Sequence, residues 1–90
     1  MTEGEKLLAE CGYEFYVYRN GLKNKSIKYE HAQNTECFIE FYIGKDACEA
    51  GVFCIDNSID NYQYEKVGTF NADLAKAIYI RLEELDRGEV

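Results

Sequence analysis

The chain has 90 residues, 47% of them hydrophobic, and a formal net charge of −7 at pH 7. This predicts one acidic domain, residues 1–90, with one modest core, and the acidity argues against a nucleic-acid binder because phosphate binding needs a basic face. No run of about 18 apolar residues occurs and the N-terminus lacks a basic-then-apolar signal pattern, so we expect no membrane span, no secretion by that route and a cytoplasmic location.

A short helix is predicted at the N-terminus. Thr2-Glu3-Gly4-Glu5 has the Thr-x-x-Glu spacing of a capping box, and Leu7, Leu8 and Cys11 then fall on one helical face. Gly12 can end the helix in a left-handed conformation.

Two strands follow this helix. Residues 13–19, "YEFYVYR", are aromatic and β-branched, as strands prefer, and Asn20-Gly21 is a hairpin signal. Ile27 and Tyr29 alternate with polar residues in the second strand. The distance between the two runs predicts a loop longer than a two-residue turn.

The clearest strand is "ECFIEFYI", residues 36–43, in which apolar side chains alternate between the two faces. Residues 44–46 read as a turn and "ACEAG" as a wider connection. "GVFCID", residues 51–56, is apolar on both parities and predicts a fourth strand, and "YQYEKV", residues 62–67, indicates a short fifth one.

The last segment predicts an amphipathic helix that begins at an N-cap, either Thr69 or Asn71, and ends before Gly88. Its apolar face holds Leu74, Ile78, Leu82 and Leu85, and its polar face holds Lys76, Glu83, Glu84 and Asp86. The fold class is therefore α+β, with the order α-β-β-β-β-α: an antiparallel meander sheet with two helices packed on one face.

"DNSIDN", residues 56–61, begins like a calcium-binding loop because oxygen-bearing side chains alternate. An EF-hand also needs glycine at position six and glutamate at position twelve, where this chain has Asn61 and Val67. We therefore favour a turn over a cation site.

The four cysteines, Cys11, Cys37, Cys48 and Cys54, include no C-x-x-C pair, which argues against a zinc site. Cys37 and Cys54 lie in apolar strands, so buried structural thiols are the favoured interpretation. A disulfide, a metal site or a Cys37–His31 nucleophile remain as alternatives. No catalytic arrangement stands out, and we expect no enzyme and no cofactor.

The sheet face opposite the helices would carry Tyr16, Tyr18, Phe38 and Tyr42, with Glu40 and Lys28 among them. Tyrosines interleaved with charges are typical of a recognition surface. The alternative is that cross-strand aromatic pairs only stabilise the sheet.

Charge is unevenly distributed. Arg19, Lys23, Lys25 and Lys28 form a basic segment, residues 19–28, whereas the remainder has six bases against seventeen acids. This predicts a basic corner on an acidic body, which serves either solubility or a basic partner.

The opening "MTEGEKLLAECGYE" and the closing "TFNADLAKAIYIRLEEL" resemble a group of short uncharacterised proteins of phages and prophages of Gram-positive bacteria. The longer middle of this chain departs from that pattern. The resemblance brings no catalytic residues, and it implies an accessory protein acting in the host cytoplasm.

We therefore predict an acidic inhibitor that binds a basic host protein, for example a nucleic-acid-binding defence effector, by filling its basic groove. The candidate partner-binding residues are Tyr16, Tyr18, Glu30, Glu36, Phe38, Glu40, Tyr42, Asp46, Glu49, Asp56 and Asp60. The alternative is a structural homodimer formed through the aromatic sheet face.

Overall fold

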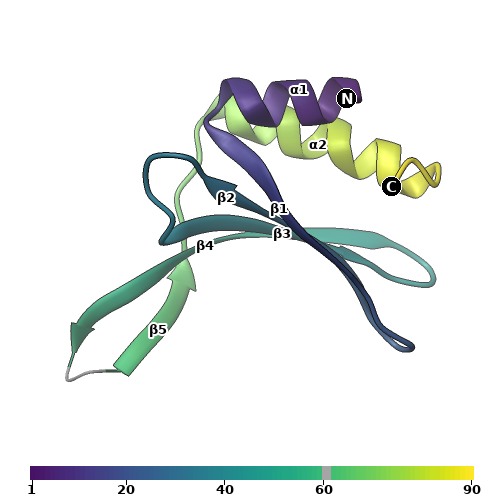
Figure 1. Ribbon diagram of the computed structural model, residues 1–90. Coiled ribbons are helices and arrows are strands. Elements are labelled where there is room, and N and C mark those ends of the chain that lie inside the picture. The colour runs from purple at the N-terminus through teal and green to yellow at the C-terminus, as the bar shows by residue number, and fades with distance from the viewer. Residues whose placement is uncertain (60–61) are drawn as a thin grey trace.

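A computed structural model describes the backbone of residues 1–59 and 62–90, and the side chains of residues 1–55 and 67–90. The elements are α1 (Glu3–Glu10), β1 (Tyr13–Asn20), β2 (Lys25–His31), β3 (Cys37–Ile43), β4 (Cys48–Ile59), β5 (Tyr62–Val67) and α2 (Ala72–Asp86). The strands form one antiparallel meander in chain order, and both helices lie on the same side of it (Figure 1). The predicted α+β class and two-helix layer are confirmed, and the fifth strand is present.

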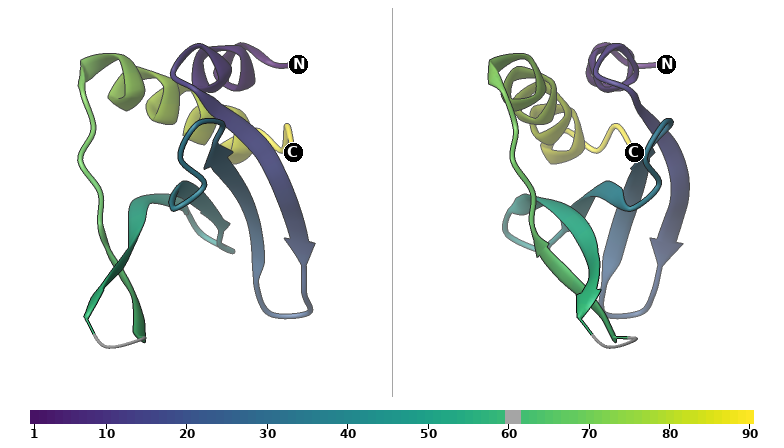
Figure 2. Two further views of the ribbon diagram at one scale, coloured as in Figure 1. Left: turned by 60° about the vertical axis from the view of Figure 1, so that its left-hand side comes forward. Right: turned by 90° about the vertical axis from the view of Figure 1, so that its left-hand side faces the viewer.

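β4 is longer than the sequence indicates. It pairs with β3 from Cys48 to Cys54 and with β5 from Phe53 to Ile59, so the end of β4 projects with β5 as a two-stranded arm (Figure 2). The "ACEAG" segment is thus mostly strand, and the backbone of "DNSIDN" is strand as far as Ile59. The side chains of residues 56–59, and residues 60–61 altogether, lie outside the described part of the chain, so neither the turn nor the cation hypothesis is tested.

The core lies between the sheet and the helices. Ile27 and Tyr29 of β2 and Ile39 and Phe41 of β3 alternate toward the helices and are almost fully buried. The helices cover them with Leu8 of α1 and with Leu74, Ala77 and Leu85 of α2. The apolar residues that recur every second position on the strands therefore pack against those that recur every 3.6 positions on the helices, and together they form one core.

The helix ends follow the predicted capping chemistry. Thr2 and Glu5 form the reciprocal capping box of α1, and Gly12 follows that helix with φ of 91°. Of the two candidate caps for α2, the structure selects Asn71, whose side-chain oxygen accepts the Leu74 amide at 2.9 Å. Gly88, with φ of 84°, follows its last turn.

The prediction that Glu84 lies on the exposed polar face of the last helix is wrong. Its side chain is buried between α1 and α2, where it accepts hydrogen bonds from Thr2 Oγ1 at 2.6 Å and from the Gly4 amide at 2.9 Å. Arg81, only 2% exposed, donates to Glu84 Oε1 at 3.2 Å and to the Tyr29 hydroxyl at 3.1 Å. α2 therefore supplies a carboxylate to the positive N-terminal end of α1.

Gly4 makes this helix contact close enough for those hydrogen bonds. A Cβ at position 4 would lie 2.6 Å from Glu84 Oε1 and 2.8 Å from the Arg81 Cα. Backbone cannot yield as a flexible side chain does, so glycine is required where α1 crosses α2.

A β-bulge divides β1. Phe15 pairs with Tyr29 and Val17 with Lys28, so Tyr16 is an extra residue on β1. Beyond the bulge the alternation is reversed, and Tyr18 pairs with Ile27, whose side chain faces the core. The prediction that Tyr18 shares the face opposite the helices with Tyr16 is therefore wrong.

Candidate functional site

We use "open face" for the side of the sheet opposite α1 and α2. Lys28 lies at its centre, paired with Glu40 on β3 and with Val17 on β1. The Lys28 ammonium lies 4.3 Å from the centroid of the Phe38 ring and 5.4 Å from that of Tyr16. The ammonium thus makes cation–π contacts with two aromatic rings, and such a contact stabilises the folded protein by about 0.5–1 kcal/mol at an exposed site.

The Phe38 ring is covered although no helix lies over it. It stacks on the Phe53 ring with centroids 5.2 Å apart and is only 2% exposed. The Phe53 ring in turn lies over Gly51, where a Cβ would come within 2.5 Å of the ring. This part of the open face is a small second packing layer, and Phe38 is therefore not available as an anchor in the isolated protein.

Carboxylates surround this layer. Glu14 and Glu30 are direct cross-strand partners on β1 and β2, and Glu49 pairs with Tyr42. In the described part of the chain, no ion pair joins any of these three glutamates to a base. Like charges directly opposite on a sheet repel and destabilise it.

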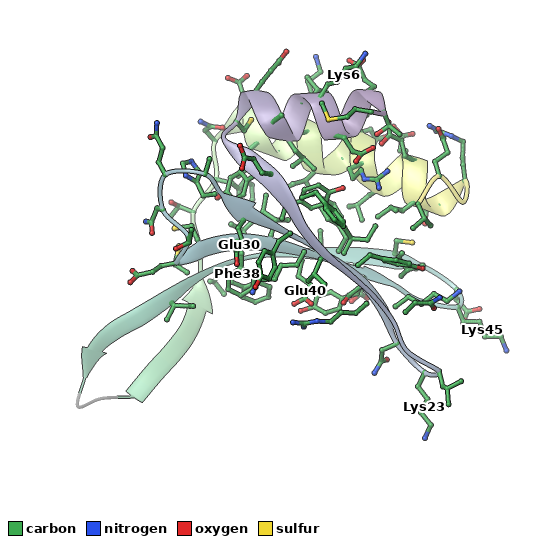
Figure 3. The ribbon with its side chains drawn as sticks, viewed as in Figure 1. Lys6, Lys23, Glu30, Phe38, Glu40 and Lys45 are labelled. Carbon is green, nitrogen blue, oxygen red and sulfur yellow. The ribbon has the colours of Figure 1, made fainter. Side chains whose placement is uncertain are left out.

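Glu40 differs because it has partners. It accepts a hydrogen bond from the Tyr42 hydroxyl at 3.1 Å, and Arg19 lies 3.8 Å from its Oε1 atom. The register places Phe38 and Glu40 on the open face, and Figure 3 shows both on the side of the sheet away from the helices.

The structure therefore brings together most of the predicted partner-binding residues. The open face holds Tyr16, Glu30, Phe38, Glu40, Tyr42 and Glu49. Glu36 precedes β3, with its amide bonded to Asn34, and Asp46 lies in the loop before β4. Tyr18 lies on the helix side. The side chain of Asp56 and the whole of Asp60 fall outside the described residues. Sequence reasoning missed Glu14. Because neighbouring residues of a strand point to opposite faces, the apolar Tyr13 on the core side could have indicated that Glu14 lies on the open face.

The predicted basic corner divides into two parts. Arg19 and Lys28 face carboxylates and rings on the open face, whereas Lys23 lies at the tip of the β1–β2 loop (Figure 3). Together with Lys25 and with Lys45 of the β3–β4 loop, Lys23 borders a shallow hollow of about 210 Å³.

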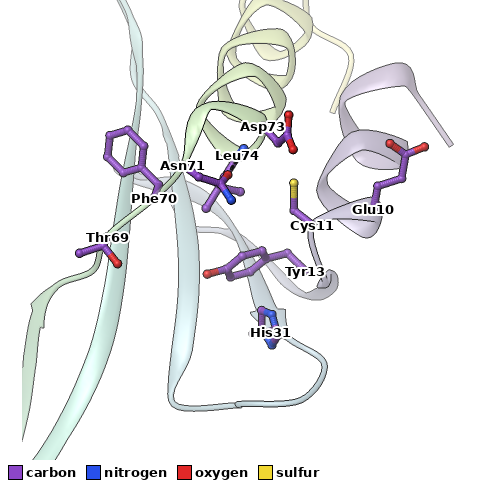
Figure 4. A pocket seen from close by; sticks show the side chains of 9 residues that line it. All are labelled: Glu10, Cys11, Tyr13, His31, Thr69, Phe70, Asn71, Asp73 and Leu74. Atoms are coloured by element: carbon purple, nitrogen blue, oxygen red, sulfur yellow. Dashed lines mark hydrogen bonds between the residues drawn. The ribbon is translucent and has the colours of Figure 1, made fainter.

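A larger hollow, of about 510 Å³, lies where α1 ends and α2 begins (Figure 4). Cys11, Tyr13, His31 and Asp73 line it. Burial, followed by the charges of Asp73 and Glu10, raises the pKa of the Cys11 thiol, which therefore stays protonated at neutral pH. A protonated thiol is a poor nucleophile.

His31, the only histidine of the chain, lines the same hollow. Its Nδ1 atom accepts the Gln33 amide at 3.2 Å, and its ring packs edge-on against Tyr13 with centroids 5.0 Å apart. These contacts give His31 a structural role at the end of β2. Among the described residues, no group of three or more His, Cys, Asp or Glu side chains is placed to hold a metal ion.

Comparison with protein-family models, with curated proteins and with solved structures finds no match to this chain. Neither described helix is long and apolar enough to cross a membrane.

Proposed function

We propose that this protein acts by binding a basic partner protein through the open face of its sheet. The observation that carries the proposal is the pair Glu14 and Glu30, which oppose each other across β1 and β2 without a neutralising base in the described chain. Such a pair costs the isolated fold about 0.2–1 kcal/mol. A lysine or arginine of a partner, placed between the two carboxylates, would convert that repulsion into attraction.

The bases already on the open face do not serve this purpose. The Lys28 ammonium lies over the Phe38 ring, and Arg19 lies beside Glu40. The repulsion between Glu14 and Glu30 therefore persists in the free protein, and Glu49 adds a third carboxylate on the same face.

The partner class that suits this face best is a protein that itself binds nucleic acid. Its phosphate-binding groove is basic, and the acidic open face can occupy that groove in place of the phosphates. With a net charge of −7, association with such a partner would be fast and sensitive to salt. In keeping with the phage resemblance, we propose a host defence effector as this partner and inhibition as the outcome.

Two tyrosines would supply the apolar part of the contact. Tyr16 is 56% exposed and lies beside Lys28, and Tyr42 is 41% exposed and lies on β3, opposite Ser26. Tyrosine gives a large contact area together with a polar tip, and it is enriched among residues that dominate binding energy.

The test compares two variants that lose the same charge. Glu14→Gln/Glu30→Gln alters the open face, and Glu3→Gln/Glu83→Gln alters exposed positions on the two helices. Each protein is used to capture partners from a Gram-positive host lysate at low and high salt, and the recovered protein is then titrated in purified form. We expect the open-face variant to bind about 10-fold more weakly and the helix variant to bind as the wild type does. Equal binding by the two variants would refute the proposed surface.

A measurement without any partner tests the carrying observation itself. Replacing Glu30 by Gln removes the repulsion from Glu14, so the free energy of unfolding should rise by about 0.2–1 kcal/mol. A decrease would show that Glu30 is stabilised by its surroundings, which would remove the physical basis of the proposal.

Self-association is the second candidate function, and the outer edge of β1 favours it. β1 is the terminal strand of the sheet, and Phe15 and Tyr16 on it are 59% and 56% exposed. An unpaired edge with exposed aromatic residues can pair with its two-fold copy. Light scattering decides between the two, because a dimer that survives high salt supports self-association and a monomer supports a basic partner.

A further inference from the structure

Two cysteines face each other across adjacent strands. Cys37 begins β3, Cys54 lies in β4, and the register makes them direct partners. Their Sγ atoms are 2.9 Å apart, and both cysteines are in the reduced form. We propose that Cys37 and Cys54 are a reversible redox site, which is oxidised to an intramolecular disulfide by a small disulfide of the glutathione class. This inference does not depend on the proposed function.

The geometry suits a disulfide without rearrangement of the backbone. Direct partners in an antiparallel pair have Cα atoms about 4.5–5.5 Å apart, which lies within the range that a disulfide spans. Their side chains also leave the sheet on the same face. Bond formation requires the two sulfurs to approach from 2.9 Å to about 2.05 Å. The other two cysteines lie elsewhere in the fold. Cys48 is the cross-strand partner of Ile43, and Cys11 is the C-cap residue of α1.

The surroundings of Cys37 favour its reaction. Both cysteines are partly exposed, so a small oxidant can reach them. The Asn34 side-chain amide donates a hydrogen bond to Cys37 Sγ at 3.4 Å, which favours the thiolate, the reactive form in disulfide exchange. This assigns Cys37 as the attacking sulfur and Cys54 as the resolving one.

The reaction balances in two exchange steps. Cys37 loses its proton to solvent and its thiolate attacks one sulfur of glutathione disulfide, which forms a mixed disulfide and releases one glutathione thiolate that takes up a proton. Cys54 then loses its proton and attacks Cys37 Sγ, which releases the second glutathione. Two protein thiols are oxidised to one disulfide, and one glutathione disulfide is reduced to two glutathione molecules.

The position of the pair gives the bond a structural effect. It joins β3 to β4 at the last rung these strands share, where β4 continues with β5 into the projecting arm (Figure 1). Gly68 follows β5, and its amide donates a hydrogen bond to the Val52 carbonyl of β4 at 2.8 Å. A Cβ at Gly68 would lie 3.4 Å from Cys54 Sγ. A disulfide would fix the root of the arm to the sheet. By restricting a loop that joins residues 17 apart, it would lower the unfolding equilibrium constant on the order of 100-fold.

The test uses two double variants of identical composition. Cys11→Ser/Cys48→Ser keeps the proposed pair, and Cys37→Ser/Cys54→Ser removes it. Each is incubated with glutathione disulfide, quenched with acid and weighed intact. We expect the first variant to lose about 2 Da, to regain that mass with dithiothreitol and to unfold at a higher urea concentration when oxidised. The second should show no such change.

Other outcomes would overturn the proposal. Stable glutathione adducts on separate cysteines, disulfide-linked dimers or an unchanged mass in the variant that keeps the pair would each show that Cys37 and Cys54 do not join. If a serine variant fails to fold, the wild type is oxidised, its remaining thiols are blocked, and its peptides are mapped. A linked peptide containing Cys37 and Cys54 supports the proposal, and any other linkage or none refutes it.

Discussion

Replacing Glu84 by Gln should be among the most damaging single changes to this fold. The Glu84 carboxylate is 3% exposed and accepts three hydrogen bonds, from Thr2 Oγ1, the Gly4 amide and Arg81 Nη1. Glutamine keeps the shape but removes the charge. It leaves the guanidinium of Arg81, itself 2% exposed, without its buried anion.

The expected cost is large relative to the stability of such a chain. Breaking a buried ion pair by neutralising one partner costs about 3–5 kcal/mol, against a total of about 5–15 kcal/mol for a typical domain. In urea titrations followed by circular dichroism, the midpoint should fall by roughly 2 M. The matched control is Glu83→Gln, one residue earlier on the exposed side of α2, which should change stability by less than about 0.5 kcal/mol.

The pH dependence of this difference follows from the pKa of Glu84. Burial alone would raise it, but the hydrogen bonds from Thr2, Gly4 and Arg81 outweigh burial and lower the pKa below its usual value. A carboxylate with a lowered folded-state pKa contributes stability above its unfolded pKa of about 4.3, and that contribution is lost as the pH falls through the folded-state value. The gap between wild type and Glu84→Gln should therefore narrow below about pH 4. Equal stability of the two glutamine variants at pH 7, or a gap independent of pH, would refute this account.

Three further substitutions test the packing. Gly51→Ala should cost about 1–3 kcal/mol and change the near-ultraviolet signal, since the new Cβ would displace the Phe53 ring. Gly12→Ala should cost at least about 1–2 kcal/mol in a urea titration, because φ of 91° is strained for alanine and its Cβ would lie 2.7 Å from His31 Nε2. Asn71→Ala should cost about 1 kcal/mol in thermal unfolding, because the N-cap of α2 is lost, and no loss of stability would mean that another group caps the helix.

The sequence predicts the layers of this fold well because their signals are local. The capping box at Thr2, the alternation in β3 and the apolar stripe of α2 each specify one element without reference to the others. The order of the strands has no such local signal, and it is the structure that shows each strand of the meander paired with its neighbour along the chain.

The missed features depend on pairs of distant residues. The bulge at Tyr16, which turns Tyr18 to the helix side, arises from the register with β2 and has no marker in the β1 sequence. Glu84 looks like a surface residue until Gly4 brings α1 against it. A signal did exist, because helical spacing carried on from Leu74 reaches Arg81 and Glu84 on the buried side.

The position of α2 has a consequence for the order in which this chain acquires its structure. The five strands pair only with sequence neighbours, so the meander can form as it emerges during synthesis. α1 packs on α2, and the apolar side of the sheet is covered only when that last helix is made (Figure 2). Until then the nascent protein exposes Ile39, Phe41 and their neighbours to solvent. Such surfaces favour aggregation and chaperone binding, so the nascent chain should be vulnerable until α2 has packed on the sheet.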